Sequence, residues 1–408
     1  MAGLACARTL EAAGVPVIVL EASDGPGGRV RTDVVDGRRL DRGFQILLTA
    51  YPELTRWFDL DALDLRAFAP GARIWTGSRF VDIGDPLRRP LDLPRTAVAP
   101  IGSIADKLRL LRLVVSVRRG PARALLRRPD RTTAEHLAQL GFSPRFVERF
   151  LEPLFAGIQL DPDLEVSSRR FEMIMRMLAT GDSVVPAAGM GALSDTLAAP
   201  LAQIRYGARA AAVSRDGVDI VDGPRLSASS VVVATDGPSA AHLLGLPDPG
   251  SRPVAAVWFD TPPLPPTGRR IVLDGCRSGP ARNVAVLSEV APSYGPADRS
   301  LVVAAVPGAG ALGNDLDRDV RAQLTGWFGP SVSEWTTVRI DRIPHGQPSQ
   351  VPPFDPRRSV RITPGLYVCG DHRDTASIQG ALFSGRRAAA AVLADRGRSD
   401  ALEGGQAS

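Results

Sequence analysis

The first residues of the chain carry a glycine and an acid at a spacing that suits nucleotide binding. Gly3 opens an alanine-rich helical pattern, and Glu21 follows the apolar run 17–20. In dinucleotide-binding units a glycine lets the backbone approach a pyrophosphate at a helix N-terminus, and an acid about 20 residues further on binds ribose hydroxyls. Gly3 and Glu21 match the third glycine and the acid of such a unit. An ordinary alanine-rich helix followed by a strand has the same spacing.

A second group of such residues follows directly, as Gly27, Gly28 and Arg29. Two glycines permit close approach of the backbone to a ligand, and an arginine supplies charge-assisted hydrogen bonds to phosphate or carbonyl oxygens. The alternative interpretation is a glycine-rich surface turn with a solvated arginine.

The third group lies near the C-terminus. The apolar run 365–369 ends at Gly370 and Asp371, and a helix begins a few residues later. The amides of a helix N-terminus favour negative charge, so this strand end and helix start are suited to a polar ligand. The residues concerned at the helix start are Ser377, Ile378, Gln379 and Gly380.

Strands and helices that alternate must position these groups. The pattern predicts a helix over 3–13, a buried strand over 17–20, and mostly helices from 85 to 178. A helix after two glycines near 190, a hairpin over 208–221 and a buried strand over 231–234 follow. Short strands with one helix occupy 253–340, and a last strand and helix complete the pattern.

Strand–loop–helix units therefore occur at both ends and in the middle of the chain, with other segments inserted between them. We expect one discontinuous nucleotide-binding domain over 1–84, 185–250 and 343–396, and a second domain over 85–184 and 251–342. The tail 397–408 is rich in glycine and polar residues, and we expect it to be disordered.

Composition narrows the class of protein. A chain of 408 residues with 44% hydrophobic and 23% charged residues is typical of a globular protein of two domains. It has neither an apolar run long enough to span a membrane nor a signal peptide. Its three cysteines (Cys6, Cys276 and Cys369) are far apart in sequence, which indicates a reducing, cytoplasmic location. No cysteine or histidine spacing resembles a metal site.

The segment 101–131 is strongly basic, with nine basic and two acidic residues. It has two interpretations: a solvated arginine-rich surface, or a peripheral contact with the inner face of an anionic membrane. Nucleic acid is a poor alternative because aromatic residues are not interleaved with these arginines.

Two longer motifs carry a resemblance to a known family. "LEASDGPGGRVRT" (20–32) and "GLYVCGDHRDTASIQGALFSGRRAA" (365–389) resemble the two FAD motifs of the amine oxidase, carotenoid desaturase and protoporphyrinogen oxidase superfamily. The resemblance implies an α/β, Rossmann-like fold of the glutathione reductase type with a mixed α+β substrate domain. It also implies FAD as cofactor, with Glu21 at the adenosine ribose and the 27–29 loop beside the pyrophosphate and flavin. Asp371 and the helix from Ser377 would hold the ribityl and flavin end.

Weaker matches fall in the same order along the chain. "VVPAAGMGALSDTLA" (184–198) resembles the segment that re-enters the FAD domain, Val213 matches the position beside the adenine, and Ala234 ends the strand that leads back to the cofactor. The resemblance further implies that Phe44, Gln45 and His345 line the substrate pocket.

The reaction is less closely specified. Many amine oxidases of the superfamily place a lysine in the strand that matches 253–260, where this chain has none; Lys107 is its one lysine. The chemistry that best suits these residues is hydride removal from a hydrophobic small molecule, as in the desaturases or protoporphyrinogen oxidases, which needs mainly positioning and a dry pocket. A flavin amine oxidase that lacks the usual lysine is the alternative. No catalytic residue can be named.

The motif around Gly3 lacks the strand and the two earlier glycines of a complete unit. The resemblance implies that Met1 corresponds to an internal methionine of the phosphate loop. We therefore expect a gap in the parallel sheet beside the strand 17–20. A third alternative is then a non-catalytic, truncated remnant that does not hold FAD.

Overall fold

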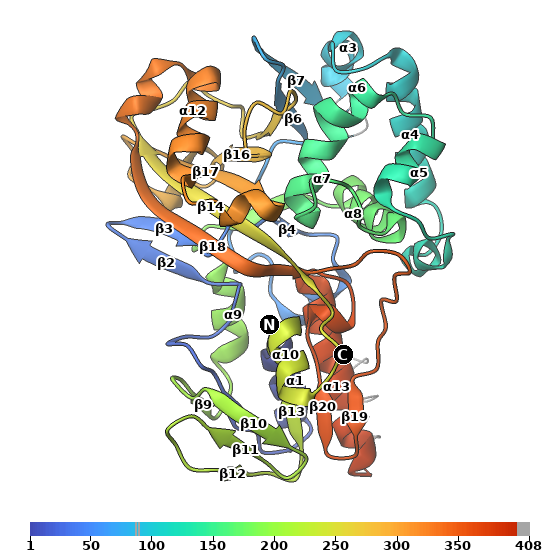
Figure 1. Ribbon diagram of the computed structural model, residues 1–408, viewed down its shortest axis with the longest axis vertical. Helices are drawn as coiled ribbons and strands as arrows, with labels where there is room; N and C mark the ends of the chain where they lie inside the picture. The colour runs from blue at the N-terminus through green and yellow to red at the C-terminus, as the bar shows by residue number, and fades with distance from the viewer. Residues whose placement is uncertain (86–87, 89, 398–408) are drawn as a thin grey trace.

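The computed structural model describes residues 1–85, 88 and 90–397. These residues form two lobes stacked along the long axis of the molecule (Figure 1). In the view of Figure 1 the lower lobe contains both chain ends, and the upper lobe contains the largest sheet.

The lower lobe is a layer of short strands packed against long helices. The sequence motifs at the two chain ends meet here, because α1 and α13 lie side by side (Figure 1). Alanine and glycine allow this close packing: a Cβ on Gly385 of α13 would lie 2.2 Å from the backbone oxygen of Ala2. The elements are α1 (Ala2–Ala12), β1 (Val19–Leu20), α9 (Gly191–Ala198), β9 (Ile204–Arg205), β10 (Ala210–Ser214), β11 (Gly217–Ile220), β12 (Leu226–Ser227), β13 (Val231–Val233), α10 (Gly237–Leu244), β19 (Arg361–Thr363), β20 (Leu366–Val368) and α13 (Ile378–Asp395).

The upper lobe is built on a seven-stranded mixed sheet in the order β18-β14-β17-β16-β15-β6-β7. Its central strands are apolar on both faces because both faces are covered: Val257 packs toward α12, whereas Trp258 packs toward the lower lobe. The elements are β6 (Gly71–Trp75), β7 (Phe80–Gly84), β14 (Ser251–Thr261), β15 (Ile271–Asp274), β16 (Asn283–Val286), α11 (Leu287–Val290), β17 (Ser300–Pro307), α12 (Leu316–Phe328) and β18 (Thr336–Pro348).

A helical layer covers the other part of the upper lobe, as the pattern over 85–178 predicts. Capping boxes start two of its helices, at Ser103 with Asp106 and at Thr132 with Glu135. The helices are α3 (Leu93–Val98), α4 (Ile104–Arg118), α5 (Thr133–Gln139), α6 (Pro144–Phe146), a π-helical turn (Val147–Leu151), α7 (Glu152–Gln159) and α8 (Ser168–Thr180).

Between the lobes lie two small antiparallel sheets and a short helix. β2 and β3 form a hairpin, and β8 pairs with both β4 and β5. The elements are β2 (Thr32–Val35), β3 (Arg38–Asp41), β4 (Leu47–Leu48), α2 (Pro52–Trp57), β5 (Leu65–Ala67) and β8 (Ser183–Pro186).

In the lower lobe, one edge of β1 has no partner strand among the described residues. This strand pairs in parallel with β9 alone among the described strands. Val19 and Glu21 donate their backbone N–H groups to the carbonyls of 203 and 205. Alternate residues of a parallel strand bond to the same neighbour, so the backbone groups of Ile18 and Leu20 face the other side. No described residue bonds to their N–H groups.

The strand β13 has a free edge of the same kind. It pairs with β20 through Val231, which donates to the carbonyl of Gly365, and through Val233, which accepts from Cys369. The backbone groups of Val232 therefore point away from β20, and no described strand accepts them. β1 and β13 border the same cavity. The gap predicted beside the strand 17–20 is present.

One sequence expectation needs correction. The boundary at residue 84 is misplaced, because β6 and β7 belong to the large sheet of the upper lobe, where β6 pairs in parallel with β15. Cys6 and Cys369, which are far apart in sequence, lie in one buried apolar cluster. The expected disordered tail over 397–408 falls, beyond Gly397, outside the described residues.

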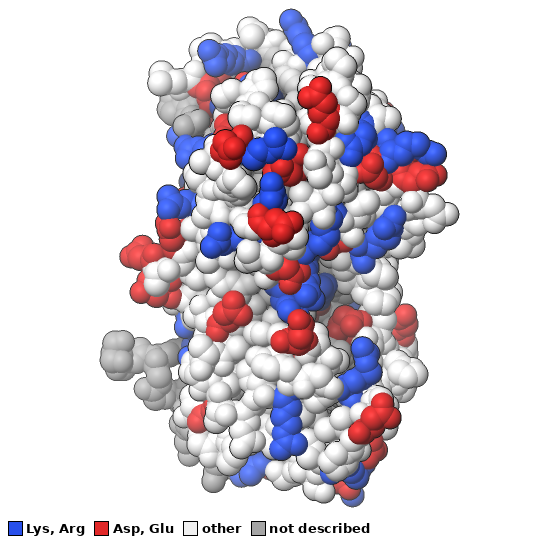
Figure 2. Space-filling model, turned by 90° about the vertical axis from the view of Figure 1, so that its left-hand side faces the viewer, with Lys and Arg blue, Asp and Glu red and all other residues white. Residues whose placement is uncertain are grey.

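Two surface features bear on partners. None of the helices in the described ranges combines the length and apolar character needed to cross a bilayer. On the side of the molecule drawn in Figure 2, basic and acidic side chains are interspersed, without a patch of one sign.

Candidate flavin site and substrate cavity

One large cavity, with a volume of about 2540 Å³, has residues of both lobes in its walls. Its lower part borders β1, β13 and the N-termini of α1 and α13, and its upper part borders α4, α7 and α8. The cavity therefore joins the two glycine-containing motifs of the chain ends to the apolar interior of the helical layer.

Glu21 lies at the end of β1, where its side chain meets the cavity. Its Oε1 accepts hydrogen bonds from the backbone N–H and the hydroxyl of Ser23, at 2.8 and 2.7 Å. These bonds fix the orientation of the carboxylate, and no described residue donates to Oε2. The free oxygen faces a space in which a ribose hydroxyl can reach it.

The loop that contains Gly27 and Gly28 turns from β1 toward the centre of the cavity. Gly27 has a positive φ of 107°, and a Cβ there would lie 2.2 Å from the carbonyl oxygen of Val30, so the turn requires glycine. Gly28 also has a positive φ, and a Cβ there would project into open space. Its backbone is consequently a bare part of the cavity wall.

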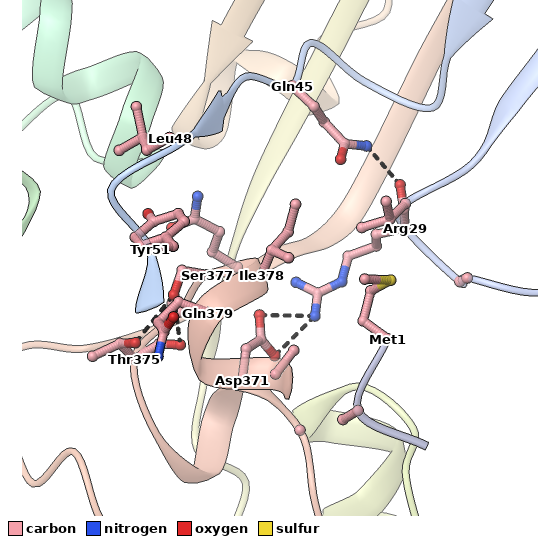
Figure 3. Close-up of a pocket in the computed structure, with 18 of the residues that line it drawn as sticks. Met1, Arg29, Gln45, Leu48, Tyr51, Asp371, Thr375, Ser377, Ile378 and Gln379 are labelled. Carbon is pink, nitrogen blue, oxygen red and sulfur yellow. Dashed lines mark hydrogen bonds and ion pairs between the residues drawn. The ribbon is translucent and has the colours of Figure 1, made fainter. Parts of the chain in front are cut away.

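Arg29 and Asp371 join the two motifs in a bidentate ion pair (Figure 3). Nη2 of Arg29 lies 2.8 and 2.9 Å from the two carboxylate oxygens of Asp371. Nη1 of Arg29 donates to the carbonyl of Gly346 on β18, and the backbone oxygen of Arg29 accepts from Gln45. The proximity of Asp371 holds the pKa of the guanidinium above its usual value, against the effect of burial. This pair is the polar centre of the cavity.

The N-terminus of α13 faces the same centre. Ser377 caps the helix and accepts a hydrogen bond from the N–H of Gly380 at 3.1 Å. Gln379 reaches sideways, and its Oε1 accepts from the N–H of Glu53. In Figure 3 Ser377 and Ile378 lie between Tyr51 and the Arg29–Asp371 pair. The first amides of an 18-residue helix thus point into the cavity, where they favour an electron-rich ligand.

Most of the predicted site residues line this cavity. Those that do are Gly3, Glu21, Gly27, Gly28, Arg29, Phe44, Gln45, Val213, Ala234, Gly370, Asp371, Ser377, Ile378 and Gln379. They come from segments at both ends and in the middle of the chain. The fold therefore brings the separate sequence motifs together at one place.

Two predicted residues do not line the cavity. His345 is exposed, and its Nδ1 lies 2.7 Å from the hydroxyl of Ser251 on the neighbouring strand. The side chains that β18 contributes to the wall are Ile343 and Gln347, so the choice of His345 was wrong. Gly380 is instead required by the local backbone, because a Cβ there would lie 1.9 Å from the carbonyl oxygen of Thr375.

Sequence reasoning missed a buried cation in the wall. Arg170 of α8 donates to the amide oxygens of Gln350 and Gln347, at 2.6 and 2.8 Å, and to the backbone oxygen of Ala376 at 2.6 Å. No described carboxylate pairs with it, and burial lowers the pKa of its guanidinium to about 10. Arg170 therefore ties the helical layer to the loop before α13. Its place in an arginine-rich helix gave no signal of this role.

A second buried group, Asp41, stabilises segments next to the cavity. Asp41 of β3 accepts hydrogen bonds from Thr32, from the hydroxyl of Tyr294 and from the backbone N–H of Met190. Burial raises the pKa of this carboxyl to about 6, although the three donors and Arg339 act to lower it. Asp41 thereby fastens the segment before α9, which re-enters the lower lobe, to the β2–β3 hairpin.

The upper part of the cavity is apolar. Its walls contain leucine, isoleucine, phenylalanine and methionine side chains from the helical layer: Ile101, Leu110, Phe146, Phe150, Leu154, Ile158, Met173, Ile174, Met177 and Leu178. Lys107 borders this part, where its ammonium donates to the carbonyls of Ala97 and Ala99. The arrangement suits a hydrophobic ligand in the upper arm and a dinucleotide in the lower one.

Several solved structures share this two-lobed architecture. A candidate protoporphyrinogen oxidase from Exiguobacterium sp. 255-15 superposes with a TM-score of 0.73 at 20% identity, over 97% of each chain. Putrescine oxidase bound to putrescine gives 0.66 at 19% identity, over 96% of this chain and 97% of that one. Cyclohexylamine oxidase from Brevibacterium oxydans IH-35A gives 0.67 at 17% identity, over 97% of each chain. The shared feature at these identities is the fold.

The fold and the cavity define a two-domain, Rossmann-like oxidoreductase. The family comparison is more specific: the model of the flavin containing amine oxidoreductases matches residues 1–393, and the chain belongs to this family. Curated protein sequences give no significant match. The predicted superfamily, the fold and the FAD cofactor are thus confirmed.

The residues present fit FAD. An acid with one free oxygen, a bare glycine turn, an arginine and a helix N-terminus follow one another along a single cavity. Glu21 would hold the adenosine ribose, Arg29 and the glycine loop the pyrophosphate, and the start of α13 the flavin end. When bound, FAD supplies an acceptor for two electrons and a proton.

Proposed function

We propose that the chain oxidises a hydrophobic small molecule by hydride removal, with FAD as acceptor. The observation that carries this proposal is the apolar upper arm of the cavity, which opens directly onto the N-terminus of α13. Hydride removal from carbon needs the substrate to be held close to the acceptor and kept from water. Apolar walls supply both, without a dedicated general base.

The polar groups of the cavity have positioning roles in this proposal. Tyr51, Gln45 and the Arg29–Asp371 pair lie around the same part of the cavity (Figure 3). Gln45 donates to the carbonyls of Arg29 and Arg42, so it holds the glycine loop in place. Arg170 holds the loop before α13 against the helical layer.

Amine oxidation is the second candidate, because two of the similar structures are amine oxidases. The strand β14, which matches 253–260, carries no lysine, and Lys107 lies on α4 in the helical layer. An amine oxidase built on this chain would have to work without that residue.

Anaerobic reduction of the FAD-loaded protein tests the proposal. Loss of the flavin band near 450 nm is followed after mixing with a cyclic tetrapyrrole in its reduced form, a polyene, or an apolar primary amine. Rapid bleaching by either of the first two, with slow or no bleaching by the amine, is the expected result. Bleaching by the amine alone would favour amine oxidation.

The same sample addresses the third alternative, a non-catalytic remnant. A protein that stays colourless after incubation with excess FAD, yet retains an apolar dye in the cavity, would favour ligand holding without redox chemistry. A protein that acquires the flavin spectrum on addition of FAD excludes that alternative for this chain.

A further inference from the structure

An exposed apolar face lies at the outer edge of the helical layer. Val98 is 81% exposed, Ile104 71%, Leu108 50% and Leu111 40%. The last three recur at intervals of four and three residues along α4, so they form one stripe on its surface. We refer to these four side chains as the 98–111 face. Leaving such a stripe in water is unfavourable, and such faces mark interaction sites.

This face borders an opening of the substrate cavity. Ile104, Leu108 and Leu111 are exposed to solvent and also line the cavity, together with the more deeply placed Ile101 and Val114. A ligand at the surface of α4 therefore meets a continuous apolar lining from the outside to the interior.

The chain segment that carries the face is almost entirely basic. Between residues 93 and 129 there are nine basic residues and a single acid, Asp106. The carboxylate of Asp106 is buried, where it accepts hydrogen bonds from Ser103 and Ser143. The side chains of five of the arginines have no hydrogen bond or ion pair with any residue that the structure describes: Arg112, Arg118, Arg119, Arg123 and Arg127.

We propose that the 98–111 face docks onto the surface of a lipid bilayer with anionic headgroups, and that apolar substrate passes from the bilayer into the cavity through this mouth. Exposed leucine and isoleucine insert among the acyl chains near the headgroups, and unpaired arginines neutralise lipid phosphates. The identity of the cargo rests on the proposed function, whereas the docking itself does not.

The sequence interpretation of 101–131 as a membrane contact is thereby refined. The apolar contacts come from α4 and the end of α3. Four of the basic residues of that segment are engaged within the protein: Arg109 pairs with Asp106, Arg128 pairs with Glu172, Arg131 donates to Gln139, and Lys107 donates to backbone carbonyls. We assign them no direct role in docking.

Vesicle co-sedimentation of the FAD-loaded protein tests the docking. Vesicles of phosphatidylcholine alone are compared with vesicles that contain roughly a third phosphatidylglycerol. The double variant Ile104→Glu/Leu108→Glu is expected to lower binding about tenfold or more. The matched control is Val34→Glu/Val221→Glu, at sites 68% and 42% exposed and away from α4, which is expected to bind like the wild type.

A charge variant separates the contribution of the arginines from that of the apolar side chains. Arg112→Gln/Arg119→Gln is expected to weaken binding to the anionic vesicles by about fivefold per arginine. It should leave the weak binding to phosphatidylcholine unchanged. Equal binding of wild type and Ile104→Glu/Leu108→Glu, or no binding of the wild type to anionic vesicles, would overturn the proposal.

Two further measurements distinguish other outcomes. If light scattering shows a dimer that Ile104→Glu/Leu108→Glu converts to a monomer, the face covers a second copy and the membrane proposal is wrong. Transfer of a fluorescent polyene fatty acid from vesicles should speed up with vesicle concentration in the wild type and the control, but not in Ile104→Glu/Leu108→Glu. Docking with no flavin reduction by apolar substrates would contradict the proposed function and leave the docking intact.

Discussion

At the scale of single residues, the ion pair of Arg29 and Asp371 is the most informative contact. Replacing Arg29 with Ala removes a charge-assisted donor from the expected pyrophosphate site. Such hydrogen bonds contribute about 2 kcal/mol, so the dissociation constant for FAD should rise roughly 30-fold. Flavin fluorescence quenching on titration with FAD measures this change.

The control for that variant is Arg66→Ala. Arg66 also forms an ion pair, with the exposed Asp64, but it does not line the cavity. Its loss should leave FAD affinity within about twofold, because exposed ion pairs contribute little. Equal effects of the two substitutions would contradict the assignment of Arg29. Urea unfolding of both apoproteins checks that folding is not the cause.

Asp41 gives a prediction about pH. Its pKa in the folded protein is raised to about 6 from an ordinary value of 3.8, chiefly by burial. A raised carboxyl pKa means that the folded state holds the proton more tightly than the unfolded chain. Its contribution to the free energy of unfolding therefore falls as pH rises from about 4 to 6, by about 3 kcal/mol in all.

Substitution of Asp41 by Asn should remove this dependence. Between pH 4 and 6.5, the free energy of unfolding of the wild type should decline relative to that of the variant, as measured by urea denaturation at several pH values. Parallel pH profiles of the two proteins would contradict the raised pKa. The comparison of two proteins cancels the titration of all other groups.

Residue types with strict backbone or charge requirements were predictable from the sequence. Glu21, Gly27 and Asp371 belong to local motifs, so their place in the cavity wall could be predicted from short stretches of chain. Arg170 was not predictable, because its partners Gln347 and Ala376 are far away in sequence and only the packing of α8 brings them together. His345 was wrongly chosen for a related reason: the pairing of β18 with β14 decides which of its side chains face the cavity.

At the scale of elements, the free edges of β1 and β13 make a direct prediction. The amides of Leu20 and Val232 have no acceptor among the described residues, whereas those of Val19 and Val231 donate to neighbouring strands. Hydrogen exchange of the apoprotein, resolved by NMR, should show fast exchange at Leu20 and Val232 and protection at Val19 and Val231. Protection of all four amides would show that another segment completes the sheet.

The sequence predicted elements best where local signals were strong. Helices α4 and α5 lie in the range 85–178 that the pattern predicts to be mostly helical, and capping boxes mark their starts. β6 and β7 were assigned to the wrong lobe, because β6 pairs with β15, about 200 residues later in the chain. A pairing over such a separation leaves no local trace in the residues of either strand.

At the scale of the whole molecule, bound FAD is expected to contact both Glu21 and the start of α13 and thereby to stabilise the folded protein. Its binding should raise the melting temperature by several degrees, since ligand at a hundredfold excess over its Kd contributes about 2.7 kcal/mol. FMN lacks the adenosine half and cannot reach Glu21 while its flavin is at α13. The shift with equimolar FMN should therefore be much smaller in a thermal denaturation assay; equal shifts would exclude an adenosine site at Glu21.

The continuous apolar cavity also has a practical consequence. Both arms form one space of about 2540 Å³ with a mouth at α4, so host-cell metabolites can enter during expression. Apolar walls such as those of the upper arm are unfavourable to leave in contact with water. Solvent extraction of freshly purified protein, followed by mass spectrometry, will therefore give an unbiased inventory of the molecules the cavity selects. The protein itself becomes the affinity reagent for the search for its substrate.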